Sequence, residues 1–252
     1  MFESGGTTKV VPPLFYICVF LTQMLQPNIF LSVDAVVFGY DPGDGISVLL
    51  IQRNIDPFKG WWALPGGLVK TNETLEHAVR RELKEEAGIE VGFMEQLYTF
   101  GDPGRDPRNR AVTVAYYCLV RPRNFRLVAK TDAADAKWFT IKDLPKLAFD
   151  HKTIVQTAID RLRGKLAYEP IGFELLESKF PFSDLESLYM TLLDKELDRR
   201  NFKKKIMAYG FLEETNEMKK QEGAGRPAAL YRFNKKRYEE LVRKGFNFDL
   251  FY

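Results

Sequence analysis

A predicted helix in the first half of the chain carries its apolar stripe into acidic residues. Leu75, Ala78 and Val79 share one side of a helix that has about 3.6 residues per turn. The stripe and its edge then continue through three carboxylates, Glu82, Glu85 and Glu86. Carboxylates on a core-facing side are costly to desolvate, and they repel one another at i and i+4. A bound cation would offset both effects, and clustered carboxylate oxygens suit Mg²⁺ or Mn²⁺.

Apolar runs predict a sheet around this helix. The predicted strands are residues 29–40, 46–53, 91–100, 111–120 and 137–140. Residues 61–70 are expected to form a loop, and a further helix is expected over 143–162 with a break near Leu147. Thr71 or Asn72 should cap the acidic helix and Gly88 should end it. This order of elements indicates an α/β fold, with a mixed sheet and helices on its faces.

The pattern changes after an expected hinge at residues 164–172. Ser183 and Glu186 have the spacing of a capping box, which predicts that a helix opens there. Asp198 is expected to cap a second helix, in which Phe202 and Ile206 share an apolar side with Tyr209. The opposite side is basic and holds Arg200, Lys203 and Lys204. Two short strands around a Gly-Ala-Gly-Arg-Pro turn follow, and they are typical of a wing.

Helix, turn, basic helix and wing together predict a winged helix-turn-helix, which places its second helix in a DNA major groove. The expected DNA contacts are Arg199, Arg200, Lys203, Lys204 and, on the wing, Arg226. Between Lys195 and Lys244 there are 15 Lys and Arg against 8 Asp and Glu, a local charge of +7 that leaves −4 elsewhere. A basic end on a mildly acidic body favours nucleic acid as a partner. The alternative is a solvated basic helix in a protein-interaction module.

Composition adds bounds on size and location. The 252 residues allow one large or two ordinary domains, and 45% hydrophobic with 28% charged residues is typical of a soluble globular protein. Cys18 and Cys118 are far apart and form no disulfide framework, so a reducing compartment and a cytoplasmic location are expected. The apolar run at residues 14–21 is too short to span a membrane. It is interpreted as a docked extension or as a misassigned start, with Met24 as the true first residue.

The acidic helix and the residues before it resemble the Nudix box. The matching residues are Gly67, Glu73, the run Arg81-Glu82-Leu83-Lys84-Glu85-Glu86-Ala87-Gly88-Ile89 and, ahead of the box, Trp62-Ala63-Leu64-Pro65-Gly66. The resemblance implies a Nudix fold that hydrolyses a nucleoside diphosphate linked to another group. It implies that Glu82, Glu85, Glu86 and the Gly66 carbonyl hold Mg²⁺ or Mn²⁺. Arg81 would orient the carboxylates and Glu73 would brace the loop. The alternatives are a Glu-rich surface helix, or a Nudix fold that no longer turns over.

The polar loop at residues 101–110 carries three arginines that suit bidentate contacts to a diphosphate. Its Asp-Pro-Gly-Arg-Asp-Pro-Arg sequence resembles the ADP-ribose branch of the Nudix family, whereas its composition alone would equally suit a solvated loop. The expected ligand-binding residues are Arg53, Gly66, Gly67, Arg105, Arg108 and Arg110.

From about Asn28 onward, nearly the whole chain resembles the Nudix-related transcriptional regulators. The resemblance is carried by the Nudix box, by Leu-Asp-Arg-Arg-Asn-Phe-Lys-Lys-Lys and by Gly-Arg-Pro-Ala-Ala-Leu-Tyr-Arg-Phe. It implies a homodimer that binds a DNA operator and senses ADP-ribose, as in the NrtR branch. A sister branch senses arabinose. The remaining alternative is an ADP-ribose pyrophosphatase whose C-terminal part does not bind DNA. The expected organisation is an extension at 1–23, a Nudix domain at 24–163 and a winged helix-turn-helix domain at 164–252.

Overall fold

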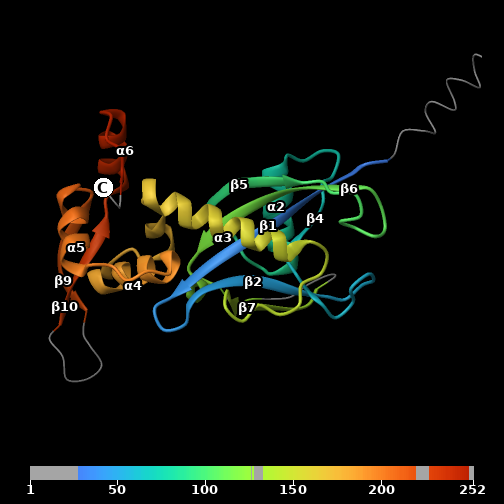
Figure 1. The fold of residues 1–252 in the computed structure, drawn as a ribbon, viewed down its shortest axis with the longest axis horizontal. Coiled ribbons are helices and arrows are strands. Elements are labelled where there is room, and N and C mark those ends of the chain that lie inside the picture. Colours follow the sequence, from blue (N-terminus) through green and yellow to red (C-terminus); the bar gives the residue numbers. More distant parts are fainter. Residues whose placement is uncertain (1–27, 126, 128–132, 220–226, 250–252) are drawn as a thin grey trace, which may run out of the picture.

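The computed structural model describes residues 28–125, 127, 133–219 and 227–249, and within them the chain forms two parts. The first is a mixed sheet with helices on both faces, and the second is a smaller helical unit with its own sheet (Figure 1). The predictions made for residues 1–23 and for Arg226 lie outside the described residues. No helix among the described residues is long and apolar enough to cross a membrane.

The large sheet is built on its longest strand, β1. This strand runs parallel to β6 and antiparallel to β2, and β5 pairs with the other edge of β6. The short strands β3 and β7 extend the sheet from β2, while β4 pairs with β1. The bounds are β1 Phe30–Asp41, β2 Gly45–Arg53, β3 Trp62–Ala63, β4 Gly66–Leu68, β5 Phe93–Phe100, β6 Ala111–Val120 and β7 Ala133–Thr140.

The predicted strands are confirmed to within a few residues, with two differences. The expected loop at residues 61–70 contains β3 and β4, because backbone pairing with neighbouring strands orders segments that are too short to show a periodic pattern. The strand expected at 137–140 begins at Ala133. Ala and Asp have low strand propensity, so this extension depends on pairing with β2.

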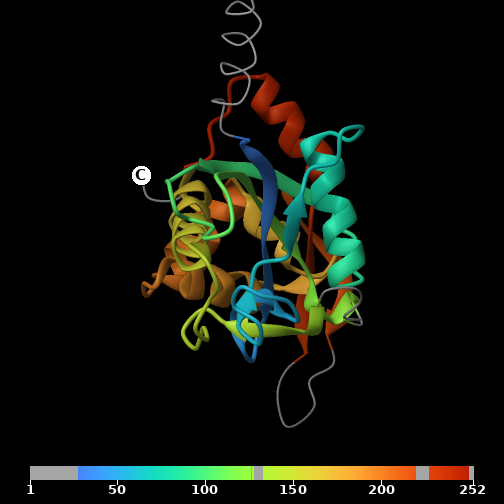
Figure 2. The same ribbon diagram turned by 90° about the vertical axis from the view of Figure 1, so that its right-hand side faces the viewer.

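The sheet is covered on both faces because successive side chains of β1 point to opposite sides. Val33, Ala35 and Val37 belong to one buried cluster, together with α2 (Leu75–Glu86). Val36 and Phe38 belong to a second cluster, together with α3 (His151–Tyr168). Figure 2 shows α2 and α3 on opposite sides of the strands.

Helix α3 differs from its prediction at both ends. The helix expected over 143–162 begins only at His151, because Phe149 has a left-handed backbone with φ of 52° that interrupts a helix. It then continues without a break through Gly164 to Tyr168 and is followed by the 3₁₀ segment η2 (Ile171–Leu175). Much of the expected hinge at 164–172 is therefore helical.

The second part has the order of elements expected for a winged helix-turn-helix. Its strands form a sheet in the order β8-β10-β9, and helices α4 and α5 precede the β9–β10 pair. The bounds are β8 Phe180–Pro181, α4 Phe182–Leu193, α5 Arg199–Ala208, β9 Leu212–Lys219, β10 Ala228–Phe233 and α6 Lys235–Arg243. The remaining element is η1, Pro122–Asn124, which follows β6.

Of the two helix caps predicted for this second part, one is confirmed and the other is wrong. Asp198 does cap α5, since its carboxylate accepts the backbone N–H groups of Arg200 and Asn201 at 3.0 and 3.1 Å. The capping box at Ser183 is wrong. Pairing of Pro181 with β10 fixes an extended residue just before Phe182, so α4 begins at Phe182, two residues before Asp184, and Ser183 lies inside its first turn.

The two parts share one continuous core. The cluster on the α3 side of the large sheet extends through Leu162 and Leu166 into Leu188 and Tyr189 of α4. The Arg163 Nε also donates a hydrogen bond to the carbonyl of Leu192 at 2.9 Å. Helix α3 therefore packs against both the sheet and the winged helix unit.

Candidate functional site

Helix α2 ends in a buried carboxylate that contacts strand β4. Thr74 caps the start of this helix by accepting the N–H of His77 at 3.2 Å, so the expected caps at Thr71 and Asn72 are wrong. Gly88 ends the helix with φ of 70°, as predicted. Glu86 is only 7% exposed, and its Oε2 accepts the backbone N–H of Gly66 at 2.8 Å. The end of α2 is thereby fixed against β4.

The two glycines of β4 allow three elements to approach closely. A Cβ at Gly66 would come 2.2 Å from the carbonyl oxygen of Val33, and a Cβ at Gly67 would come 2.3 Å from Oε1 of Glu82. Burial raises the pKa of Glu82, although its hydrogen bond with Arg81 opposes this. A side chain at 66 would therefore collide with β1, and a side chain at 67 would push the Glu82 carboxylate away from β4.

Arg81 of α2 contacts three acidic residues, one before the helix and two on it. Its guanidinium binds both oxygens of Glu73 at 2.6 and 2.9 Å, and it also contacts Glu82 at 2.6 Å and Glu85 at 3.3 Å. Glu73 in addition accepts the N–H of Lys70 at 2.8 Å, which closes the loop before α2. Arg81 is thus held between α2 and the preceding loop by its contacts with Glu73 and Glu82.

A cavity of about 500 Å³ opens beside these residues. Most of the expected site residues line it, namely Arg53, Gly66, Gly67, Arg81, Glu82, Glu86, Arg105 and Arg108. Glu73, Glu85 and Arg110 are not among the described residues that line it. Arg110 instead donates to the carbonyl of Ala111 at 3.2 Å, and Glu85 is 44% exposed and contacts Arg81 at 3.3 Å.

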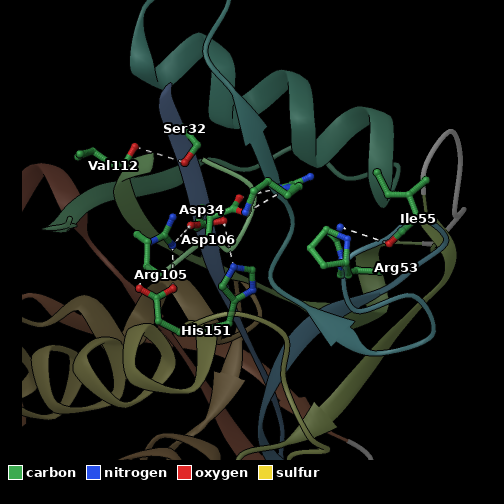
Figure 3. Close-up of polar contacts among 11 residues, drawn as sticks. Ser32, Asp34, Arg53, Ile55, Arg105, Asp106, Val112 and His151 are labelled. Atoms are coloured by element: carbon green, nitrogen blue, oxygen red, sulfur yellow. Dashed lines mark hydrogen bonds and ion pairs between the residues drawn. The ribbon is translucent and has the colours of Figure 1, made fainter. Parts of the chain in front are cut away.

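A charged network that the sequence analysis missed forms one wall of the cavity (Figure 3). Arg105 donates two hydrogen bonds to Asp150 at 2.8 and 2.9 Å, and a third to Asp34 at 3.3 Å. Its side chain is only 6% exposed. Burial tends to lower the pKa of Arg105, but the hydrogen bonds and charges of Asp150 and Asp34 outweigh it, so this pKa is raised.

His151 belongs to the same network. Its Nδ1 accepts the N–H of Leu64 at 2.9 Å, so the ring proton is on Nε2, which faces Oδ1 of Asp34 at 3.5 Å. Burial lowers the pKa of His151, which keeps the ring neutral. Asp150 is the N-cap residue of α3, and the imidazole of His151, the next residue, lies in the cavity wall.

An aromatic ring forms another part of the cavity lining. Phe149 has the guanidinium of Arg53 over its ring at 4.8 Å and that of Arg108 at 5.6 Å. Phe58 packs edge-on against the same ring, with centroids 4.9 Å apart. Two basic residues from β2 and the β5–β6 loop therefore meet at one aromatic platform.

The sequence contained weak signals for the missed residues. Asp34 interrupts the otherwise apolar run from Val33 to Phe38, and a buried charge in a central strand requires a partner. Phe149, Asp150 and His151 are adjacent in sequence, but nothing local showed that they would meet Asp34 and Arg105. His77 is exposed and Cys118 is buried.

The donor set near β4 fits a hard divalent cation. Glu82 and Glu86 both line the cavity beside Gly66, and carboxylate and carbonyl oxygens are the ligands that Mg²⁺ and Mn²⁺ prefer. Among the described residues, however, no three His, Cys, Asp or Glu side chains are gathered as one metal-holding group. Arg81 neutralises Glu82 and Glu85 in the present arrangement.

The second surface of interest lies on the winged helix unit. Phe202 and Ile206 of α5 are buried, whereas Arg199, Arg200, Lys203 and Lys204 are exposed, as the helical period predicted. These four residues line a shallow hollow together with Glu186 of α4. Lys203 also has its Nζ 5.2 Å from the ring centroid of Phe182 and 5.3 Å from that of Tyr231. We call Arg199, Arg200, Lys203 and Lys204 the basic face.

Comparison with known families agrees with both parts of this structure. Residues 30–158 match the NUDIX domain, and residues 172–233 match the NrtR DNA-binding winged helix domain. The chain therefore belongs to the Nudix family, in the branch that carries this DNA-binding domain.

Individual relatives share the same organisation. The chain is 33% identical to the ADPR responsive transcriptional repressor NtrR of Acinetobacter baylyi, over 84% of this chain and 85% of the relative. It is 42% identical to an ADP-ribose pyrophosphatase of Methanocaldococcus jannaschii, over 47% of this chain and 67% of the relative.

The fold is also similar to that of Shewanella oneidensis NrtR complexed with a 27mer DNA. The TM-score is 0.73 at 32% identity, over 83% of this chain and 95% of that one. The NUDIX domain of the same protein complexed with ADP ribose matches with a TM-score of 0.51 at 34% identity, over 60% of this chain and 99% of that one.

Proposed function

We propose that this protein is a DNA-binding transcriptional regulator whose Nudix domain binds ADP-ribose or a related nucleotide. One observation carries the proposal. A cavity lined by arginines and Nudix-box carboxylates shares helix α3 and a continuous core with a winged helix unit that has an exposed basic face. The relatives that bind DNA and ADP-ribose support it.

The ligand should place its diphosphate among the basic groups of the cavity. Arg105 and Arg108 come from the β5–β6 loop and Arg53 from β2, and all three line the same space. Guanidinium groups suit phosphate oxygens because they donate two parallel hydrogen bonds. The ring of Phe149 offers a surface on which a planar base or ribose could pack. Arg110 is less suited to bind the ligand, because it does not line the cavity.

The DNA partner should be a double-stranded operator with two half-sites. A homodimer would present two basic faces about 34 Å apart, the length of one DNA turn. Arg200 is exposed near the start of α5 and suits guanine, whereas Lys203 and Lys204 suit phosphates. A DNA partner also implies a cytoplasmic location.

The regulator is tested by measuring its affinity for operator fragments from the regions beside its own gene. We expect saturating ADP-ribose to weaken operator binding by about 5- to 150-fold, a coupling of about 1–3 kcal/mol. Unchanged operator affinity with bound ADP-ribose would reject the ADP-ribose sensor. A response to arabinose in the same titration would assign the protein to the sugar-sensing branch.

The same cavity supports a second candidate function, hydrolysis of the bound nucleotide. Glu82 and Glu86 would hold Mg²⁺ or Mn²⁺ near the Gly66 carbonyl, and the cation would supply charge stabilisation at the phosphoryl group. Water would attack one phosphorus and break its bond to the bridging oxygen, which converts ADP-ribose and water to AMP and ribose 5-phosphate. Arg81 would orient the carboxylates, and arginines of the cavity would bind the phosphates.

Product analysis with each divalent metal tests this second function. Glu86→Gln should abolish AMP formation, because it removes a charged oxygen ligand with little change of shape. Glu90→Gln is a matched control, since Glu90 is exposed and pairs only with Lys84 at 3.0 Å among the contacts described. If the wild-type protein forms no AMP with any metal, the Nudix box serves ligand binding alone.

A further inference from the structure

Arg105 lies between the ligand cavity and Asp150, the residue just before α3. It lines the cavity and at the same time holds both oxygens of Asp150, the N-cap residue of α3, at 2.8 and 2.9 Å. This ion pair joins residues that are 45 positions apart in sequence. The Arg105 side chain is 6% exposed and that of Asp150 is 23% exposed, so the pair is largely shielded from water.

Within this network a single positive charge faces two carboxylates. Asp34 and Asp150 contribute two negative charges, Arg105 contributes one positive charge, and His151 is neutral. A diphosphate that enters the cavity adds further negative charge within reach of the same guanidinium. The Nε and Nη2 groups of Arg105 donate to the two aspartates, so a diphosphate that binds this edge of the guanidinium competes with Asp150 for it.

We propose that Arg105 and Asp150 form a latch that the ligand opens: the diphosphate takes Arg105, and the start of α3 loses its tie to the β5–β6 loop. The inference rests on the proposed regulator and names the residues through which its ligand acts. Arg105 contacts the ligand, whereas Asp150 is a positioning residue. The contacts of His151 with Leu64 and with Asp34 of β1 remain, so the start of α3 can turn about them once Arg105 is released.

Helix α3 carries this change to the DNA-binding unit. Its backbone is continuous from His151 to Tyr168, and a helix of this length moves as one body. Its far end donates the hydrogen bond from Arg163 to Leu192, at the end of α4. Helix α4 in turn packs against Phe202 of α5 through Phe182 and Tyr189, with ring centroids 5.8 and 5.3 Å apart. A small displacement at Asp150 would therefore reorient the basic face.

The latch predicts that ligand affinity and ligand response change in opposite directions. Asp150→Asn removes the charge that competes for Arg105, so ADP-ribose should bind more tightly in calorimetry. The ligand-dependent change in operator affinity, about 5- to 150-fold in the wild type, should shrink towards unity. Asp160→Asn is the matched control, because Asp160 is exposed on the same helix and accepts a hydrogen bond from Gln156. It should keep the wild-type affinity and response.

Hydrogen exchange of the wild-type protein provides a test that needs no variant. The amides of Thr153 and Ile154 donate to the carbonyl of Asp150 at 2.8 and 3.2 Å. ADP-ribose should speed exchange in the first turn of α3, and an inert analogue without the diphosphate, such as adenosine, should not.

The outcomes separate the latch from the proposed function. A wild-type operator response in Asp150→Asn, or slow first-turn exchange in protein shown by calorimetry to be saturated with ADP-ribose, would overturn the latch and leave the regulator intact. Bound ADP-ribose with no effect on the operator affinity of the wild type would remove the regulator and the latch together.

Discussion

The carboxylate of Glu82 lies directly against the backbone of Gly67, so that a Cβ at position 67 would come 2.3 Å from its Oε1. Gly67 is part of β4, and Glu82 is on α2. The absence of a side chain at 67 thus leaves room for the Glu82 carboxylate beside β4. This space beside Gly67 and the hydrogen bond from Gly66 to Glu86 together determine the positions of the Glu82 and Glu86 carboxylates in the cavity.

This contact predicts the effect of a single methyl group. Gly67→Ala should displace Glu82 and lower metal-dependent cleavage of ADP-ribose by about 10- to 100-fold, because catalytic groups tolerate little misplacement. If the protein proves to be a non-hydrolysing sensor, the same variant should weaken binding of Mn²⁺ together with ADP-ribose in calorimetry. Gly92→Ala is the control, since nothing lies within 4 Å of a Cβ at position 92. Equal behaviour of the two variants would contradict the proposed role of Glu82.

The ion pair between Glu73 and Arg81 predicts a dependence of stability on pH. The hydrogen bond from Arg81 lowers the pKa of Glu73 from 4.5 to about 2. A depressed carboxyl pKa stabilises the fold above the ordinary pKa, and this contribution disappears as the pH falls through the folded value. Glu73→Gln should therefore lower the Tm near neutral pH. The difference from wild type should shrink below about pH 4.5 and vanish near pH 2.

Thermal unfolding followed by circular dichroism across this range measures the effect. Glu90→Gln should leave the Tm close to that of the wild type, because the pair of Glu90 with Lys84 is exposed and such pairs contribute little. A Glu73→Gln deficit that stays constant from neutral to acidic pH would show that the carboxylate charge does not stabilise the loop before α2.

The basic face predicts two kinds of effect on DNA binding. Arg200→Ala should weaken specific operator binding by about 1–3 kcal/mol if it contacts a base edge, and non-specific binding much less. Lys203→Ala should weaken binding to all sequences and reduce the salt slope by about one. It should also lower the stability by about 0.5–1 kcal/mol, because Lys203 lies beside the rings of Phe182 and Tyr231.

Gel shifts at several salt concentrations distinguish these effects. Lys152→Ala is a control, because Lys152 is exposed on α3 in the Nudix part. If Arg200→Ala and Lys203→Ala both retain wild-type affinity and salt slope, the basic face does not contact DNA.

Sequence patterns predicted the parts of this structure that depend on local order. The helical period correctly placed Phe202 and Ile206 inside and Arg200 outside, because the side of a helix that packs is determined by residues one turn apart. The same reasoning identified Glu86 as a carboxylate on a buried stripe. Asp198 was recognisable as a cap because capping involves only the next two or three residues.

The network around Arg105 could not be predicted in this way. Asp34, Arg105 and Asp150 come from a strand, a loop and a helix start, and they meet only through the tertiary fold, which includes the pairing of β1 with β6. The late start of α3 was missed for a related reason. The left-handed backbone of Phe149 is held by contacts with Phe58 and His151, and Phe is a residue that rarely adopts it.

The continuous course of α3 leads to a last prediction, about the expected hinge. Gly164 is exposed in the helix and nothing lies within 4 Å of a Cβ built on it. Alanine is favoured over glycine inside helices, so Gly164→Ala should raise the free energy of unfolding by about 0.5–1 kcal/mol in urea denaturation. At Gly172, by contrast, a Cβ would come 3.1 Å from Tyr189 and 3.3 Å from Leu166, so Gly172→Ala should destabilise the protein.

The ligand response distinguishes a rigid helix from a hinge. If α3 moves as one body, Gly164→Ala should keep the full effect of ADP-ribose on operator affinity, because a helix that is already rigid is displaced to the same extent when it is stiffened further. If the two parts instead rotate about a flexible point at residue 164, the same substitution should reduce that effect. Operator titrations of Gly164→Ala with and without ADP-ribose, beside the urea curves, decide between them, because a hinge would combine higher stability with a weaker response.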